Sequence, residues 1–288
     1  MASDHDMFVF DRRLLTLRRS RAARHAIGHD YLLQQVSEDI GSRLELIRRR
    51  FPVALNLGAH HGLLGRRLRA IRGVELVIDA DPSPLLLAQC DGPRVRADEE
   101  LLPFADRTFD LIASGLALHM VNDLPGALVQ IRRALKPDGL LLAAVLGGST
   151  LCELRHALLV AEADGEHGAS PRVAPFADIQ QLGALLQRAK FALPVVDSVK
   201  LTVTYADPVA LMRELRAMGA SNVLRARRRV PLRRATLLHA IDCYRQQFGL
   251  ANGRVPATFE VLTLTAWAPP DPGPPRAAAP RATHRRSP

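Results

Sequence analysis

Short, continuous apolar runs separated by amphipathic stretches dominate the chain between residues 53 and 147. Continuous runs are typical of strands that are buried on both faces of a parallel sheet, and apolar residues at helical spacing indicate helices between them. The predicted strands are VALNLG (53–58), VELVIDAD (74–81), FDLIASG (109–115) and GLLLAAVLG (139–147). The predicted helices are 64–71, 84–89 and 125–135. This alternation predicts an α/β fold with a doubly wound, mostly parallel sheet.

The pattern is different on either side of this region. The first ten residues are polar, and a loose segment is expected there. From Tyr31 onward, apolar residues at helical spacing predict one helix that ends near Phe51-Pro52. After Gly148 the sequence predicts helices at 175–189, 207–219 and 234–248, an extended segment at 191–205 and an alternating strand at 258–267. The expected divisions are a helical extension (1–50), one domain (51–268) with a helical insertion at about 206–255, and a disordered Pro- and Arg-rich tail (269–288).

The charge of the chain is strongly positive. Its 288 residues carry a formal net charge of +10, and arginines gather in 11–24, 225–234 and 276–286. Aromatic residues make up only 5% of the chain, so platforms for base stacking are scarce and no specific nucleic-acid partner is expected. The arginine segments are then solvated surface, or they contact an acidic protein or an anionic membrane.

Cysteine usage and apolar length indicate the compartment. Cys90, Cys152 and Cys243 are far apart and odd in number, which predicts neither a disulfide framework nor a metal site. The N-terminus lacks the apolar segment of a signal peptide, and no apolar run approaches the ~20 residues that span a bilayer. We therefore expect a soluble, cytoplasmic protein, with peripheral contact to the inner membrane as a further option.

The stretch LNLGAHHGLLG (55–65) lies between the first predicted strand and its helix, where a nucleotide-binding glycine loop belongs. Gly58 and Gly62 permit a tight turn, and the helix N-terminus offers free N–H groups to an anion. The next strand ends in Asp81, where an acid holds ribose hydroxyls. We expect an adenosine-containing ligand. The adjacent histidines, His60 and His61, rarely point the same way, and no third ligand follows at a recognised spacing, so no metal site is expected.

Longer motifs resemble known enzymes. LPF…FDLI…S and LKPDG are similar to the class I S-adenosylmethionine-dependent methyltransferases. LHMVNDLP, GGSTLCELRHAL, SPRVAPFADIQQLGALLQRA, MGASN and VPATFEVL more specifically resemble the mitochondrial complex I assembly factors that hydroxylate an arginine on an iron–sulfur subunit of NADH dehydrogenase, together with their bacterial relatives. This resemblance spans roughly residues 8 to 268. The malonyl-carrier-protein methyltransferases of biotin synthesis are similar over the middle portion only.

The resemblance implies a seven-stranded Rossmann-like methyltransferase sheet that binds S-adenosyl-L-methionine or S-adenosyl-L-homocysteine. It assigns the methionine end of this cofactor to the loop, the ribose to Asp81, the adenine amine to Asp98, and the ring packing to Leu101. The cofactor residues that it implies are Gly58, Ala59, His60, Gly62, Asp81, Asp98, Glu99, Leu101 and Ser114. His119 matches the histidine of the family's L-H-W-V-N-D motif and is the candidate catalytic residue, or else part of the pocket wall.

His60 departs from the family pattern, which has a glycine there. If the backbone requires a positive φ, the β-carbon adds strain. The imidazole would either crowd the methionine moiety or bind its carboxylate.

Three functions follow from this sequence. The first is hydroxylation of a protein arginine during assembly of respiratory complex I, as the resemblance implies, with an iron–sulfur subunit of NADH dehydrogenase as the expected partner. The second is conventional methyl transfer to a small molecule, protein or RNA. The third is a non-catalytic assembly scaffold. The residues show no familiar iron site from which an oxygen-activating mechanism could be derived.

Overall fold

The apolar runs form the centre of a seven-stranded sheet in the computed structural model, which describes residues 8–163 and 168–271. The strand order is β3-β2-β1-β4-β5-β7-β6. Strands β1 to β5 pair in parallel, whereas β7 is antiparallel to both β5 and β6. The predicted α/β class with a mostly parallel sheet is therefore confirmed. The strands are β1 (Val53–Leu57), β2 (Leu76–Asp81), β3 (Arg94–Arg96), β4 (Phe109–Gly115), β5 (Leu135–Leu146), β6 (Ala192–Tyr205) and β7 (Val255–Trp267).

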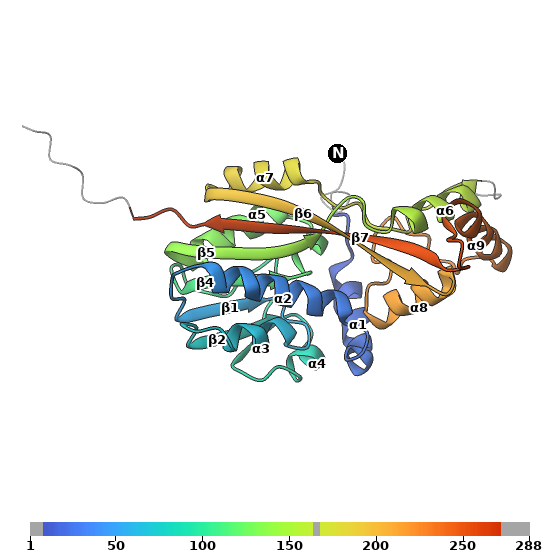
Figure 1. The fold of residues 1–288 in the computed structure, drawn as a ribbon. Coiled ribbons are helices and arrows are strands. Elements are labelled where there is room, and N and C mark those ends of the chain that lie inside the picture. The colour runs from blue at the N-terminus through green and yellow to red at the C-terminus, as the bar shows by residue number, and fades with distance from the viewer. Residues whose placement is uncertain (1–7, 164–167, 272–288) are drawn as a thin grey trace, which may run out of the picture.

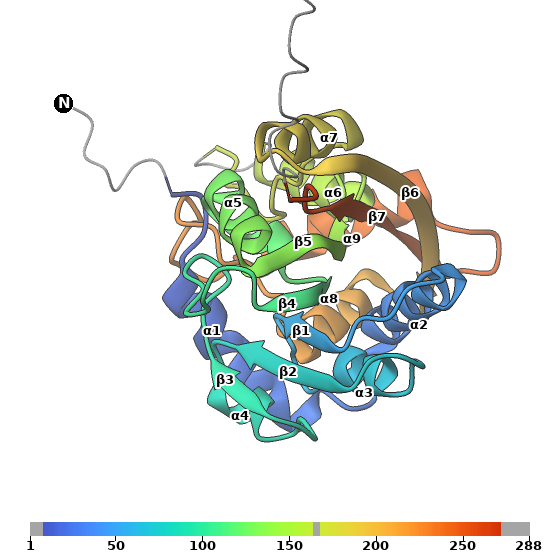
Figure 2. The ribbon, with the colours of Figure 1, turned by 90° about the vertical axis from the view of Figure 1, so that its left-hand side faces the viewer.

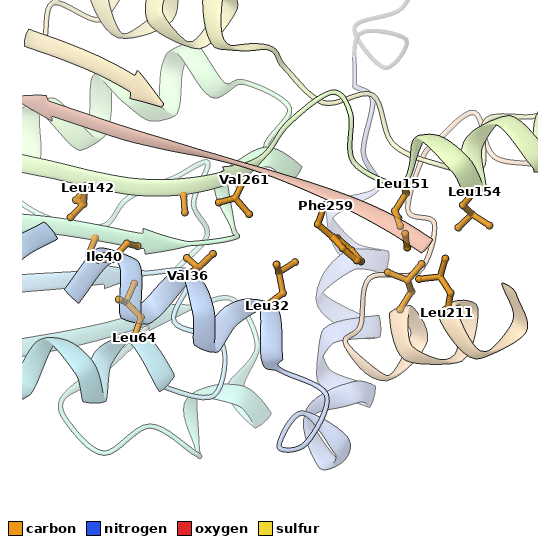
Figure 3. Close-up of a cluster of buried hydrophobic side chains, with 14 of the residues drawn as sticks. Leu32, Val36, Ile40, Leu64, Leu142, Leu151, Leu154, Leu211, Phe259 and Val261 are labelled. Atoms are coloured by element: carbon orange, nitrogen blue, oxygen red, sulfur yellow. The ribbon is translucent and has the colours of Figure 1, made fainter. Parts of the chain in front are cut away.

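Helices cover both faces of the sheet (Figure 2), and each covered face has its own apolar core. Helices α5 and α7 lie over one face, while α2 and α3 lie over the other. Helix α2 buries Leu32, Val36, Ile40 and Leu44, which recur at helical spacing. Figure 3 shows Leu32, Val36 and Ile40 pointing toward the sheet. The helices are α1 (Arg12–Ala22), α2 (Tyr31–Leu46), α3 (Leu63–Arg69), α4 (Pro84–Leu87), α5 (Leu124–Ala134), α6 (Cys152–Ala163), α7 (Ile179–Arg188), α8 (Pro208–Ala217) and α9 (Arg234–Phe248), with 3-10 turns η2 (Ala23–His25) and η3 (Leu118–Met120).

Strands β6 and β7 extend beyond the parallel strands and carry a second group of helices. The pairing of β5 with β7 ends at Leu146 and Val261, whereas the pairing of β6 with β7 continues to Tyr205 and Val255. Helices α6, α8 and α9 pack around this two-stranded ribbon, at the far right in Figure 1. Phe259 is 1% exposed at the centre of their shared core (Figure 3). The ribbon therefore forms a wall next to the ends of the parallel strands.

The structure differs from the sequence prediction at the N-terminal end of the chain. Phe10, expected in a loose segment, is 6% exposed and packs with Leu15 and Val223. Asp11 then caps α1, because its carboxylate accepts the N–H of Leu14 at 3.0 Å. Of the predicted disordered tail, 272–288 lies outside the described residues. None of the helices within the described residues is long and apolar enough to cross a membrane.

Candidate functional site

The glycine loop lies at the carboxyl edge of the parallel strands, the edge at which ligands gather in such sheets. Strand β1 ends at Leu57, and the backbone N–H groups of Gly58 and Ala59 then donate to the carbonyl of Ala80, at 2.8 and 2.9 Å. Gly58 adopts a φ of +69° and leaves no space for a side chain, since an added β-carbon would lie 2.1 Å from that of Ala117. Gly62, with a φ of +86°, begins α3. Both glycines are therefore required by the backbone.

Asp81 lies at the end of β2 and supports the loop. Its carboxylate accepts the N–H of His60 at 3.0 Å and that of Ser83 at 2.8 Å. The side chain is completely buried, and burial raises the pKa of Asp81 to about 6, although the nearby Arg19 guanidinium lowers it. A carboxylate has about four acceptor positions, so two hydrogen bonds leave part of its capacity unused. Asp81 therefore lies beside the loop with part of its acceptor capacity unused.

His60 occupies the centre of the loop with a φ of +50°. This is the left-handed conformation, in which a residue with a β-carbon is more strained than glycine. Its ring nitrogen Nε2 lies 3.1 Å from the carbonyl oxygen of Gly115, at the end of β4. Burial and the charge of Arg19 lower the pKa of His60 well below its ordinary value, so the ring is neutral and donates this hydrogen bond. The imidazole therefore links the ends of β1 and β4 across the predicted methionine subsite.

His61 and Asn56 have partners of their own. His61 Nε2 lies 2.9 Å from the carboxylate of Asp30, on the side of α2, so the two neighbouring histidines point to different partners. The Asn56 amide donates to Asp79 at 2.7 Å in a fully buried pair. An aspartate at position 56 would place two carboxylates together, which explains why asparagine suits this position.

The two acids after β3 are held by the N-terminal helix. Arg12 on α1 donates to Asp98 at 2.6 Å and also to Glu99, whose side chain is completely buried. It reaches the carbonyl of Met120 at 3.1 Å as well. Burial lowers the pKa of Arg12, but the charges of Glu99 and Asp98 outweigh this effect and raise the pKa above its ordinary value. Asp98, the acid that the resemblance assigns to the adenine amine, therefore already pairs with Arg12 of the same chain.

A second arginine, Arg19, lies two turns along the same helix. Its side chain is 7% exposed and forms an ion pair with Glu99 at 3.5 Å. The hydroxyls of Ser20 and Ser83 are 2.7 Å apart and attach the helix beside Asp81. Helix α1 thus covers the carboxyl edge of β2 and β3 (Figure 1). The expectation that the arginines of 11–24 are solvated or bind a partner is wrong for these two, because they pair with buried acids inside the chain.

His119 and Ser114 lie on the β4 side of the edge. The His119 ring is edge-on to Phe176, with centroids 5.4 Å apart, and burial together with Arg19 lowers the pKa of His119 to about 3. Such a neutral ring is a weak general base at pH 7, but it can donate or accept a hydrogen bond. Ser114 is completely buried. Both residues come from the end of β4 and the turn that follows it.

The remaining predicted residues fall in different surroundings. Leu101 is 74% exposed, so the structure gives it no buried ring to pack against. Its neighbour Leu102 is half-buried, and the Leu102 N–H donates to Gln130 at 3.0 Å. Arg12 and Arg19 are the site residues that the sequence analysis missed. Their seven-residue spacing, which puts both on one helix face with Leu15 between them, is the signal that could have revealed them.

Unpartnered polar atoms concentrate at this edge. Among the described residues, eight buried side-chain nitrogen or oxygen atoms lack a hydrogen-bond partner. Five belong to this edge: Arg12 Nε, Arg19 Nη1, Glu99 Oε1, Ser114 Oγ and His119 Nδ1. Buried polar atoms in native proteins are normally paired. Arg19 Nη1 and Glu99 Oε1 face each other at 3.5 Å, and Arg12 Nε faces Glu100 at 3.8 Å. Ser114 Oγ and His119 Nδ1 therefore remain as the two atoms that fit a polar ligand.

Metal binding has no comparable support. Within 8–163 and 168–271, no group of three or more His, Cys, Asp or Glu side chains is placed to hold a metal ion. The absence of such a group carries no conclusion about the reaction.

Residues 55–143 match the family described as a methyltransferase domain. The arginine-hydroxylase NDUFAF5 of Danio rerio is 38% identical, over 94% of this chain and 86% of its own length. The malonyl-[acyl-carrier protein] O-methyltransferase of Halorhodospira halophila is 37% identical, over 82% and 81%. The solved YcgJ protein of Bacillus subtilis has a TM-score of 0.57 at 15% identity, covering 81% of this chain and 98% of its own, and shows the fold alone.

These comparisons correct two expectations. The similarity to the malonyl-carrier-protein methyltransferases is not limited to the middle portion, since it extends over 82% of the chain. The arginine hydroxylases of Danio rerio and Mus musculus are mitochondrial proteins, and this contradicts the prediction of a cytoplasmic location.

Proposed function

Since the chain belongs to the family of the arginine-hydroxylase NDUFAF5, with a methyltransferase fold, we propose that it is an enzyme that hydroxylates an arginine side chain of a protein in respiratory complex I assembly. The observation that carries this proposal is similarity along the whole domain: the mouse arginine hydroxylase is 40% identical over 90% of this chain. The similarity therefore extends well beyond residues 55–143, the part that matches the methyltransferase domain. The protein substrate that we propose is an iron–sulfur subunit of NADH dehydrogenase.

We also propose that the carboxyl edge binds S-adenosyl-L-methionine or S-adenosyl-L-homocysteine. The loop from Gly58 to Gly62 would approach the amino-acid end, while Asp81 would accept the ribose hydroxyls and Asp98 the adenine amine. S-adenosylmethionine supplies a methyl group activated by its sulfonium centre, and S-adenosylhomocysteine lacks this group. The unpartnered Ser114 Oγ and His119 Nδ1 at this edge support a polar ligand there.

The chain's own residues orient the ligand and exclude water. Helix α1 covers the acids, and Arg12 neutralises Asp98 and Glu99, so the carboxylates do not repel one another. The low pKa of His119 keeps its ring uncharged beside Arg19, so the unpartnered Nδ1 is available for a hydrogen bond to a substrate atom. In this role His119 orients the substrate rather than removing a proton.

Conventional methyl transfer is the second candidate. The specific observation that favours it is the 37% identity to a malonyl-[acyl-carrier protein] O-methyltransferase over 82% of the chain. Positioning the acceptor atom near the activated methyl group would carry most of that chemistry.

Intact-mass analysis of the iron–sulfur subunit separates these functions. The subunit is purified from cells with the gene, without it, and with an Asp81→Asn variant. If the protein hydroxylates the subunit, the deletion makes it lighter by one oxygen atom. A subunit lighter by one CH₂ group would instead support methylation. An unchanged mass would overturn both enzymatic proposals for this substrate and leave the scaffold.

Calorimetry tests the cofactor proposal independently. Asp81→Asn should weaken S-adenosylmethionine binding about tenfold or more, because a charge-assisted hydrogen bond to the ribose becomes a neutral one. Asp91→Asn is the matched control, since Asp91 is 58% exposed and pairs only loosely with Arg66 at 3.4 Å. Equal affinity in the two variants, or no binding to the wild type, would refute the assignment of the ribose acid.

A further inference from the structure

A large cavity lies between the carboxyl edge and the ribbon. Its volume is about 420 Å³, which is within the range of small-molecule sites and far above the voids left in packed interiors. One wall comes from α1, α2 and η3, and the opposite wall comes from α6, α8 and the segments around Phe176 and Val223. His60 and His119 line it, but Asp81 and Asp98 do not. The cavity therefore extends away from the adenosine acids, toward the helices of the ribbon.

Most of this cavity is apolar. Its lining includes Leu146, Leu154, Leu158, Met212, Met218 and Phe259. Unbranched, polarisable methionine side chains adapt to the shape of an apolar ligand. A deep surface of this kind suits an extended hydrocarbon chain, and it offers few polar partners for a sugar or a peptide backbone.

The polar end of the cavity is cationic. Arg19 lines it with a side chain that is 93% buried, and Arg19 Nη1 forms only a 3.5 Å ion pair with Glu99 and no hydrogen bond. His119 also lines it and presents the unpartnered Nδ1. Arg172 and Arg216 also line the cavity, and Arg172 donates to the buried Glu162 at 2.8 Å. The carboxylate in the lining, Asp30, is already bound by His61 and Gln34, each at 2.9 Å.

We propose that this cavity binds an apolar carboxylate, a fatty acid or fatty acyl group, with its carboxylate on Arg19 and its chain between the leucines of α6 and the methionines of α8 and its following turn. The arginines disfavour a cationic ligand. A guanidinium edge matches the two oxygens of a carboxylate. The cavity shares His60 and His119 with the site proposed above, but the binding of an apolar carboxylate does not rest on the proposed hydroxylation.

Calorimetry with the full chain tests this proposal, with dodecanoate and dodecanol as probes below their aggregation concentrations. The two probes share the apolar chain and differ in the charged end. The wild type should bind dodecanoate about tenfold or more tightly than dodecanol, because of the charge-assisted hydrogen bond to Arg19. Arg19→Gln should remove this preference, and Arg19→Lys should retain most of it. Arg21→Gln, an exposed position on the same helix, is the matched control and should behave as the wild type.

A second variant tests the apolar part. Leu154→Phe adds volume to the wall and should weaken the binding of both probes by a similar factor. The preference for dodecanoate over dodecanol should remain, because Arg19 is unchanged. Thermal unfolding verifies that each variant is folded. Equal affinities of the wild type for both probes, no binding of either, or an unchanged preference in folded Arg19→Gln would overturn the proposal. If Arg19→Gln weakens S-adenosylmethionine binding and leaves dodecanoate binding unaffected, Arg19 serves the cofactor and the proposal is wrong.

Discussion

The contact between α1 and the acids after β3 makes a quantitative prediction for Arg12→Met. Methionine keeps much of the arginine stem's volume and removes the guanidinium. Glu99 then loses the partner of Oε2, and its completely buried carboxylate retains only Arg19, at 3.5 Å. Removing one partner of a buried ion pair costs roughly 3–5 kcal/mol, and because Arg19 remains we expect the lower end, about 3 kcal/mol. This is a large share of the ~5–15 kcal/mol typical of a folded protein.

Urea unfolding at pH 7.5 measures this free energy. Arg50→Met is the matched control, because Arg50 and Glu75 form an ion pair at 2.7 Å in which the side chains are 75% and 59% exposed. Such a surface pair contributes ~0–1 kcal/mol, and added salt weakens it further. The loss in Arg12→Met should persist in high salt. Hydrogen exchange should also show faster opening of α1 in Arg12→Met, since the arginine attaches the helix to the sheet.

The reasoning is refuted if Arg12→Met costs no more free energy of unfolding than Arg50→Met. The same conclusion follows if its effect disappears in high salt. Either result would mean that Glu99 finds water or another partner when Arg12 is removed, and that α1 is held by its apolar contacts alone.

Three further predictions concern the loop and the edge of the sheet. The pKa of His119 is lowered to about 3 in the folded protein, below the unfolded value near 6.5, so the free energy of unfolding falls as the pH drops below about 6.5. Between pH 7.5 and pH 5.5 in urea unfolding, the free energy of unfolding of His119→Gln should therefore decrease by about 1.4 kcal/mol less than that of the wild type. Gly58→Ala should lower the free energy of unfolding by more than about 3 kcal/mol, because the positive φ adds strain and the new β-carbon clashes with Ala117. Gly28→Ala, at φ +94° with nothing within 4 Å, should lower it by only about 1–2 kcal/mol, and equal losses would contradict the packing argument. Asn56→Asp should be destabilising at pH 7.5 and partly recover at low pH, as protonation relieves the repulsion from Asp79, and a pH-independent cost would exclude that cause.

The fold was predictable because continuous apolar runs specify strands buried on both faces, and each pair of runs is joined by a helical segment. The boundaries were less accurate where polar residues enter a strand. Strand β5 begins at Leu135, four residues before the predicted run, because Lys136 to Asp138 lie at an irregularity in its pairing with β4. Asp138 has a positive φ of 56° there. Such a local break depends on the neighbouring strand, so the apolar pattern does not reveal it.

The position of the site was predictable for a related reason. The carboxyl ends of β1, β2 and β4 must meet at one edge of a parallel sheet, and this places the loop, Asp81 and His119 together from their positions in the sequence alone. The environment of these residues was not predictable in the same way. Leu101 follows the acids immediately in sequence, yet it is 74% exposed, because the chain turns outward after the bridge between Asp98 and Leu101.

The arginines of α1 show why the side chains that pack at this edge of the sheet could not be predicted from the sequence. In isolation, a run with arginines at 12, 13, 18 and 19 is a solvated helix face, because burying a guanidinium without a partner costs far more than leaving it in water. Arg12 can be buried only because Asp98 and Glu99, 86 and 87 residues away, provide the opposite charge. Arg19 is buried on the same helix, pairs with Glu99 at 3.5 Å, and lines the apolar cavity. Helix α1 thus carries both the arginine that pairs with Asp98 and Glu99 and the arginine that lines the neighbouring cavity.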